Sequence, residues 1–314
     1  MFRKFLFVSV STLLLCTLTS FTTNTNNIRK PRLQQHLLRT IIIDAGHGGP
    51  DIGAVGDYSN EADITLAVAL KLGKKIEDSL PDCKIIYTRT THELPGGLQD
   101  HNAANRLRAK IANESHGDLF ISIHVNDLAH PYNKEVVGHR TETYYKGKGA
   151  KRTKHTREVP IIKYTKLPGV QTGTETYIWA VGKNEQKKEF VNQNEEELYG
   201  EKTDSNYQYF DSPESKILAS LRTQKYFNNS RLIAGYVQDE FEDLGRKNLG
   251  VKQRDWEGIW VLQATAMPSI LVETGFICTP SEEEYLNSEK GQDETANCIY
   301  NAIIRYRQNL EGGR

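Results

Sequence analysis

The sequence predicts an α/β fold, a single three-layer domain in which helices flank a largely parallel, twisted central sheet. Three short apolar segments that contain isoleucine pairs or alternations, at 40–44, 84–88 and 118–124, have the composition of buried strands. Segments with helical periodicity separate them, and this alternation of strands and helices is typical of layered α/β domains. We expect the domain to span residues 39–310.

The first half of the domain has the clearest elements. The strand at 40–44 ends in a glycine-rich loop at 46–49, and Asn60 then offers a helix N-cap with Asp63 at the third position. A second helix is expected at about 102–113. In the first helix an apolar residue recurs at every fourth position, which predicts a buried stripe made of Ile64, Val68, Leu72 and Ile76.

Two polar stretches interrupt the second half. We expect the residues at about 127–172 and 182–213 to form insertions within the same domain, because apolar elements resume after each of them. The remaining elements are expected to be strands at 173–180, 256–264 and 269–274, and helices at 215–244 and 293–310.

The charge of the chain is balanced, with 40 basic and 40 acidic residues. Such a chain has no net field that would gather nucleic acid or an anionic membrane, so we expect no nucleic-acid partner. Hydrophobic residues make up 38% of the chain, which is enough for a packed core.

Cysteine usage excludes a disulfide scaffold, because four cysteines are too few for a chain of 314 residues. Beyond the N-terminal segment, Cys83, Cys278 and Cys298 are spaced too widely for a zinc site built on cysteines. We expect them to be small buried side chains, and a disulfide between two of them is the alternative.

Residues 1–23 have the pattern of a secretory signal peptide. Arg3 and Lys4 precede a mostly apolar segment at 5–18, which is too short to span a membrane comfortably. An uncleaved N-terminal anchor is the alternative. Polar residues at 24–38 then form a tether, and no other stretch of the sequence is apolar enough to cross a bilayer.

These features predict an exported protein with no stable membrane span once it is mature. We expect the periplasm as its compartment. Lipid attachment at Cys16 is less favoured, because Leu15 is bulkier than the residue that usually precedes a lipid-modified cysteine.

Four polar side chains stand where elements of the predicted fold begin or end. His47 closes the first strand, and His124 closes the third. Glu61 opens the first helix, and Glu273 lies near the end of the strand at 269–274. Because the carboxyl ends of parallel strands meet at one edge, these residues can share a crevice. Two histidines and a carboxylate are a common zinc set, and a further carboxylate can serve as general base.

Each of these residues also has a purely structural explanation. His47 could be a polar loop residue, Glu61 a favourable charge in the first turn of a helix, and His124 a hydrogen-bonded core histidine. Glu273 is harder to explain in this way, because a carboxylate in an apolar strand needs a partner. The residues alone leave both explanations open.

Four segments around these residues resemble the zinc-dependent N-acetylmuramoyl-L-alanine amidase family of the Amidase_3 type. Four ordered motifs with matching neighbours are a specific signal. The resemblance covers about 39–126 and 214–309. The segments are IIIDAGHGGPDIGAVG (41–56), NEADITLAVAL (60–70), GDLFISIHVN (117–126) and PSILVETGFICTPSEEEYL (268–286).

The resemblance implies one zinc ion (Zn²⁺) held by His47, Glu61 and His124, with Glu273 as the catalytic glutamate. It also implies hydrolysis of the amide between N-acetylmuramic acid and the L-alanine of the stem peptide in peptidoglycan. Zinc lowers the pKa of bound water to about 7, and Glu273 would accept the proton and pass it to the leaving amine.

Other polar residues surround the implied site. Asp44, Asp51 and Asn126 are candidates for side chains that orient the ligands. Gln263 departs from the family pattern, because many relatives carry a basic residue there, which puts one substrate contact in doubt.

The insertion at 127–172 begins directly after His124 and Asn126, so it emerges beside the implied metal. Residues 134–166 contain ten lysines and arginines against three acidic residues, a net charge of +7. A solvated loop is the default expectation for such a run. In some relatives an insertion here covers the site until a protein activator displaces it, and the resemblance implies such a partner as one alternative. Contact with anionic groups of the wall, or with an acidic partner, is another.

The leading hypothesis is an exported zinc amidase of peptidoglycan that acts in cell-wall remodelling or daughter-cell separation. A zinc peptidase that cleaves stem peptides or exported proteins is the enzymatic alternative, because the residues that select the bond lie in loops. A non-catalytic wall-binding protein on the same fold would lack a ligand or the base, whereas this chain has all four residues.

Overall fold

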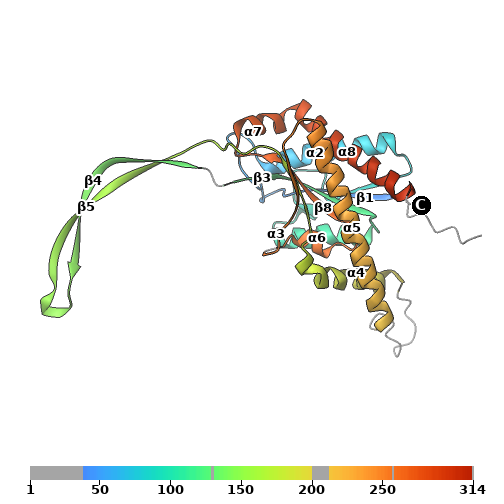
Figure 1. Cartoon of the computed structure of the whole chain (residues 1–314), viewed down its shortest axis with the longest axis horizontal. Coiled ribbons are helices and arrows are strands. Elements are labelled where there is room, and N and C mark those ends of the chain that lie inside the picture. The colour runs from blue at the N-terminus through green and yellow to red at the C-terminus, as the bar shows by residue number, and fades with distance from the viewer. Residues whose placement is uncertain (1–37, 129–130, 200–211, 257, 313–314) are drawn as a thin grey trace, which may run out of the picture. The chain divides into compact units, whose positions relative to one another are not determined.

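A computed structural model of the chain describes four ranges of residues, 38–128, 131–199, 212–256 and 258–312 (Figure 1). The expected signal peptide at 1–23 and the tether, apart from Leu38, lie outside these ranges. Within them, no helix is both long enough and apolar enough to cross a membrane.

A six-stranded sheet forms the centre of the domain, with the strand order β2-β1-β3-β8-β6-β7. Neighbouring strands are parallel except for the β6–β8 pair, which is antiparallel. The expected largely parallel sheet is therefore confirmed. Its strands are β1 (Thr40–Ala45), β2 (Lys84–Tyr87), β3 (Leu119–Asn126), β6 (Thr174–Ile178), β7 (Asn248–Gln253) and β8 (Ser269–Phe276).

Helices cover both faces of this sheet, which gives the three expected layers (Figure 1). One face packs on α2 (Glu61–Ser79), α5 (Pro213–Asp243) and α8 (Glu289–Gly312). The other face packs on α3 (His101–Glu114) and α6 (Trp260–Ala264). The described residues also form α4 (Asn184–Tyr199) and α7 (Pro280–Asn287).

The alternation of side chains along the strands determines which face receives the polar residues. Ile41 and Ile43 pack toward α2, α5 and α8, so Asp44 points to the opposite side, toward α3 and α6. The same alternation on β3 and β8 places His124 and Glu273 on that side, directly opposite each other in the strand register. Three neighbouring strands therefore present polar side chains on one face.

Helix ends and cysteines agree with the expectations. The side chain of Asn60 caps α2 by accepting a hydrogen bond from the backbone N–H of Asp63 at 3.0 Å. Cys83, Cys278 and Cys298 are all buried and none forms a disulfide, as expected for small core side chains.

The prediction of a strand at 256–264 is wrong. Residues 260–264 form helix α6, and the missing edge strand is β7, which lies upstream at 248–253. Gly258, with a φ of 75°, turns the chain, and the backbone N–H of Leu262 then donates to Ile259 O in a helical turn. A short apolar run is compatible with either a strand or a helix, and here the packing against the sheet decides for a helix.

The prediction of a loop at 127–172 is also wrong for most of this segment. Strands β4 (Tyr132–Lys146) and β5 (Thr153–Lys166) form an antiparallel two-stranded hairpin. Threonine, valine and tyrosine occur in both strands, and β5 adds two isoleucines; these residue types favour extended backbone even between charged neighbours.

The second polar stretch, expected at 182–213, begins as helix α4 and is joined to the core. Lys187 is fully buried, and its amino group donates a hydrogen bond to Leu262 O in α6 at 2.7 Å. Burial lowers the pKa of Lys187 well below its usual value, and the ring of Trp179, whose centre lies 4.4 Å from the amino group, offsets this only in part. Helix α4 therefore helps to hold α6, which borders the site described below.

Candidate metal centre

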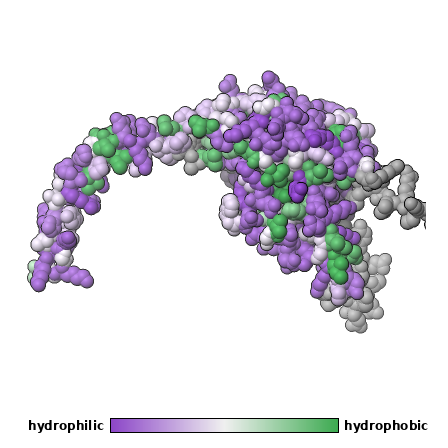
Figure 2. Space-filling view, viewed as in Figure 1, coloured by the Kyte–Doolittle hydropathy of each residue, from purple (hydrophilic) through white to green (hydrophobic). Residues whose placement is uncertain are grey.

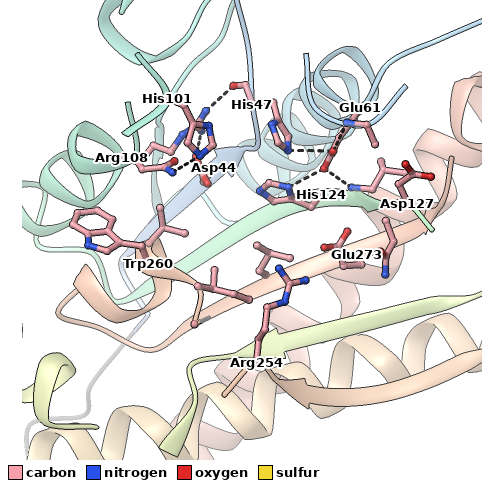
Figure 3. Close-up of a pocket in the computed structure, with 18 of the residues that line it drawn as sticks. Asp44, His47, Glu61, His101, Arg108, His124, Asp127, Arg254, Trp260 and Glu273 are labelled. Atoms are coloured by element: carbon pink, nitrogen blue, oxygen red, sulfur yellow. Dashed lines mark hydrogen bonds and ion pairs between the residues drawn. The ribbon is translucent and has the colours of Figure 1, made fainter. Parts of the chain in front are cut away.

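Three of the expected site residues meet at the carboxyl edge of the sheet (Figure 3). His47 lies in the loop after β1, Glu61 is the first residue of α2, and His124 lies near the end of β3. One ligand atom from each lies within 4.8 Å of those of the other two. This arrangement can hold a single metal ion.

Glycines allow the loop that carries His47 to pass close to its neighbours. A Cβ atom on Gly46 would lie 2.5 Å from the ring of His124, and one on Gly53 would lie 2.6 Å from Glu61 Oε2. His47 has a φ of 61°, a strained value for a residue with a side chain and one that is typical of functional sites. The close packing of the three candidate ligands thus depends on these glycines.

Asp51 fixes the orientation of the His47 ring. Its Oδ1 accepts a hydrogen bond from His47 Nδ1 at 2.9 Å. Because a carboxylate only accepts, Nδ1 carries a hydrogen, and Nε2, 3.1 Å from Glu61 Oε2, is the ring nitrogen left to face a metal. Asp51 Oδ2 also contacts the ring of His101 at 2.5 Å. The support expected from Asp51 is present, and His101 is a member of the site that the sequence analysis missed.

The electrostatics of the three candidate ligands favour a bound cation. Burial disfavours a charge on Glu61, but hydrogen bonds from His124 and His47 outweigh it and lower the pKa of the carboxyl group. Burial also disfavours the imidazolium form of His47, but its contacts with Glu61 and Asp51 raise its pKa to about 9. Without a metal the cluster therefore holds a proton where a metal cation fits.

Glu273 lies beside these ligands and is only 8% exposed. Its Oε2 atom is buried and has no hydrogen-bond partner among the described residues. Burial and the charges of Glu61 and Glu175 raise the pKa of Glu273 to about 8. A buried oxygen without a partner indicates a site that a further group completes, and a pKa near neutrality suits proton transfer.

Asp44 supports the main chain behind the loop rather than the ligands themselves. It forms a buried ion pair with Arg108 and accepts hydrogen bonds from Thr88 and Ser122. Arg108 in turn donates to His47 O at 2.6 Å. Asp44 and Arg108 therefore fix the backbone at His47.

Arg89 is a second anchor of this loop and was missed by the sequence analysis. Its buried guanidinium donates to Ala45 O at 2.9 Å, to Gly46 O at 2.7 Å and to Ala62 O at 2.8 Å. These bonds join the loop after β1 to the first turn of α2, where Glu61 lies. The available signal was a basic residue directly after an apolar strand.

Glu175 on β6 is a buried carboxylate that the sequence analysis also missed. It lies opposite Glu273 in the strand register and forms an ion pair with Lys252. It accepts hydrogen bonds from Asn126 Nδ2 at 2.5 Å and from the hydroxyl of Tyr177 at 2.8 Å. Asn126 therefore orients Glu175 and not a candidate ligand. An acidic residue within the apolar strand at 173–180 was the available signal.

A cleft of about 520 Å³ opens over these residues (Figure 3). The candidate ligands line one side of it, and Glu273 and Arg254 lie across from them. The guanidinium of Arg254 stacks on Tyr177, 5.0 Å from the ring centre. Gln263 lines the same cleft, so the residue that departs from the family pattern does face the site.

Comparison with known proteins agrees with this geometry. The family model described as N-acetylmuramoyl-L-alanine amidase matches residues 41–305. A germination-specific N-acetylmuramoyl-L-alanine amidase of Bacillus subtilis is 26% identical, with 85% of this chain and 79% of the relative covered. The amidase AmiC of Escherichia coli is 29% identical, and the match covers 85% of this chain and 52% of AmiC.

Solved structures support the same fold. An N-acetylmuramoyl-L-alanine amidase from Clostridium difficile superposes with a TM-score of 0.51 at 23% identity, over 86% of this chain and 97% of the other. The CwlD amidase from Clostridioides difficile, solved in complex with the GerS lipoprotein, has a TM-score of 0.50 at 23% identity, over 85% of this chain and 98% of the other. With its sequence matched to the family model over most of its length, this chain belongs to the N-acetylmuramoyl-L-alanine amidase family.

Proposed function

We propose that this protein is an exported, zinc-dependent hydrolase of peptidoglycan that cleaves the amide between N-acetylmuramic acid and the L-alanine of the stem peptide. The observation that carries the proposal is the convergence of His47, Glu61 and His124 beside the unpaired oxygen of Glu273. Membership of the amidase family supports the choice of bond and polymer.

In this proposal His47, Glu61 and His124 hold one zinc ion. Two imidazoles and one carboxylate are a usual donor set for catalytic zinc. When bound, zinc supplies Lewis acidity, which activates water and polarises the scissile carbonyl. Asp51 prepares the site by accepting a hydrogen bond from His47 Nδ1, so that Nε2 is the nitrogen that would bind the metal in place of its proton.

Glu273 is the proposed proton-transfer group. Burial keeps its pKa near neutrality, and positive charge at the neighbouring ligands favours the carboxylate form. The carboxylate accepts a proton from the attacking water and donates it to the nitrogen of the departing L-alanine. Glu175 lies opposite Glu273, and its negative charge helps to raise the pKa of Glu273, which favours donation of the proton to the leaving nitrogen.

Digestion of purified peptidoglycan tests the proposed bond. The chain from residue 24 onward, with and without a chelator, is incubated with the polymer, and the products are identified by mass spectrometry. We expect free stem peptides that begin with L-alanine, together with peptide-free glycan, and only without chelator. Products cut within the peptide would contradict the amidase assignment and establish the zinc peptidase alternative.

Export to the periplasm is part of the proposal, because the substrate lies outside the cytoplasm and the first residues have the signal-peptide pattern. Mass spectrometry of the N-terminus of protein recovered from the producing cell tests it. A chain that starts between residues 15 and 30 supports export, whereas an intact Met1 contradicts cleavage.

A protein activator that acts on the 127–172 insertion is a second proposal, supported by the position of the insertion directly after His124. Leu167 N donates to Pro131 O at 2.8 Å, so the two ends of the hairpin are adjacent and three residues, Gly-Ser-Gly, can replace 132–166. If the hairpin inhibits the site, this replacement raises turnover of a soluble muropeptide several-fold. Equal turnover by the two proteins would exclude inhibition by the hairpin.

A further inference from the structure

The β4–β5 hairpin is exposed on both of its faces. Nearly every residue of the two strands is exposed, and the remainder are only partly buried. Within the described residues the two strands pair with each other and not with the central sheet. Isolated two-stranded ribbons gain little stability in water. A ribbon of this length that contributes nothing to the core is therefore a candidate for binding a partner outside the domain.

The hairpin concentrates the positive charge of the chain. Of the 40 basic and 40 acidic residues, ten basic and three acidic ones lie at 134–166, which leaves thirty basic and thirty-seven acidic residues elsewhere. No acidic residue occurs between Glu142 and Glu158, and Glu142 is paired with Arg157 at 2.6 Å. The tip of the hairpin, defined as 143–157, thus contains six basic residues and no acidic one.

The cations point to both faces of the ribbon. In the register of the two strands, Arg140, Lys146 and Lys163 lie on one face. Lys134, Lys154 and Lys166 lie on the other. Strand β5, with fourteen residues, extends over about 46 Å, so the charge is spread along a rod. A flat surface would meet only one face, whereas an open anionic network can contact both.

The side chains of the tip do not suit a bilayer. Between Thr143 and Arg157 the apolar residues are Ala150 and two tyrosines, and large aliphatic side chains are absent. The exposed aliphatic residues lie further along the strands, at Val136, Val137, Ile161 and Ile162. Figure 2 shows the hairpin as mainly hydrophilic with separate hydrophobic patches. Tyrosine rings stacked with Arg152 and Arg157 offer polar, rigid contact surfaces instead.

We propose that the β4–β5 hairpin is a wall-binding arm whose lysines and arginines bind the carboxylates of peptidoglycan stem peptides. This inference rests on the proposed function, because it takes the polymer substrate as the ligand. The free carboxylates of stem peptides recur along and between glycan strands, and a cationic rod can pair with several at once. Binding by many weak pairs holds the enzyme on the insoluble polymer between cleavage events.

Sedimentation with purified insoluble peptidoglycan tests the arm. In a Glu273→Gln background, which leaves the polymer intact, five tip cations are changed to glutamine at Lys146, Lys148, Lys151, Arg152 and Lys154. The control changes five lysines on the helices to glutamine, so the net charge is the same; these are Lys74, Lys110, Lys216, Lys225 and Lys290, all exposed. We expect the tip variant to bind at least ~10-fold more weakly and the control to bind within ~2-fold of the parent.

Two further binding measurements identify the ligand. The parent protein should no longer sediment with peptidoglycan whose carboxylates have been converted to amides, and raised salt should release it from untreated polymer. Equal binding by the tip and control variants would overturn the inference, as would retention on amidated polymer. Binding to phosphatidylglycerol vesicles but not to peptidoglycan would also overturn it, in favour of a membrane.

Failure of the arm and failure of the proposed function give different results. Turnover of a soluble muropeptide by the unsubstituted protein reports on the proposed reaction without the polymer. If the muropeptide is turned over and the two variants sediment equally, only the wall-binding role of the hairpin is rejected. If the soluble muropeptide is not turned over, the proposed function is rejected.

Discussion

The carboxyl edge of the central sheet and the β4–β5 hairpin both concentrate charged residues, but they hold them in opposite ways. At the sheet edge Asp44, Glu61 and Glu273 are each less than a tenth exposed, and fixed donors bind most of their oxygens. In the hairpin most charged side chains are exposed and face solvent on both sides of the ribbon. Buried charges cost free energy unless they are paired, whereas exposed charges are nearly neutral for stability.

This difference implies two kinds of function. The sheet edge depends on positions, because a shift of one ligand or one anchor changes what the site can bind. The hairpin depends on the number of its charges, because many weak contacts add up on a polymer. Four sets of variants test this difference between the two regions.

The buried ion pair should show the largest effect on stability. Asp44→Asn leaves the guanidinium of Arg108 charged and without its counter-ion, at 3% exposure. We expect the free energy of unfolding to fall by about 3–5 kcal/mol, as measured by urea denaturation. The matched control is Asp239→Asn, which breaks a half-exposed pair with Arg305 and should cost about 0.2–1 kcal/mol. Equal losses from the two substitutions would show that burial does not distinguish them.

Substitution of the glycine before His47 should have the next largest effect, which is on zinc affinity. In Gly46→Ala the new methyl group would lie 2.5 Å from the His124 ring, which must move. We expect zinc affinity to fall by about 10- to 100-fold, the range usual for a disturbed ligand orientation, as measured by competition with a fluorescent chelator. Gly235→Ala in α5 meets no atom within 4 Å and serves as control. Unchanged zinc affinity in Gly46→Ala would contradict the packing argument.

Without metal, the sheet edge should make the protein less stable as the pH rises. The folded state raises the pKa of His47 from 6.5 to about 9 and that of Glu273 to about 8, so it keeps protons that the unfolded chain releases. The folded state then binds more protons, and the free energy of unfolding falls with pH, by up to about 1.4 kcal/mol per pH unit for each proton.

Urea denaturation in the presence of a chelator, at several pH values between 6.5 and 9, measures this slope. His47→Gln should reduce this slope to the part that comes from Glu273, whereas His92→Gln, at a side chain that is 79% exposed, should leave it unchanged. A slope of the opposite sign in the unsubstituted, metal-free protein would contradict the assigned protonation of the cluster.

Replacement of the hairpin should have the smallest effect on stability. With residues 132–166 exchanged for Gly-Ser-Gly, we expect the free energy of unfolding to change by less than about 1 kcal/mol, because the two strands bury little surface. Urea denaturation of the two proteins measures the change. A loss of several kcal/mol would show that the hairpin packs on the domain and is no separate arm.

The sequence alone was sufficient for the core strands, whereas the candidate ligands also needed the resemblance to the amidase family, because each of them had a structural explanation as well. Nearly continuous apolar runs mark β1, β3 and β8 as buried strands, and His47, Glu61, His124 and Glu273 stand at element ends where polar residues are conspicuous. Asn60 and the apolar stripe that follows it likewise predict α2 from local interactions.

Other features depend on contacts between distant residues, which the sequence does not display. Arg89 is an anchor only because three carbonyl groups from two elements converge on it. The run at 260–264 becomes a helix because of its packing with α4 and the sheet. The charged residues obscured the strand pattern of the hairpin in the sequence, because cross-strand pairs such as Glu142 with Arg157 form only once the strands are aligned.

Zinc content and turnover, measured together in two glutamate variants, test the central claim most directly. Glu273→Gln should retain one equivalent of zinc by elemental analysis and lose at least about 100-fold in turnover of a soluble muropeptide, because it lacks only the proton-transfer group. Glu61→Gln should lose the zinc itself. If Glu273→Gln also loses its zinc, Glu273 is a ligand, and the division between metal-binding and proton-transfer residues described here is wrong.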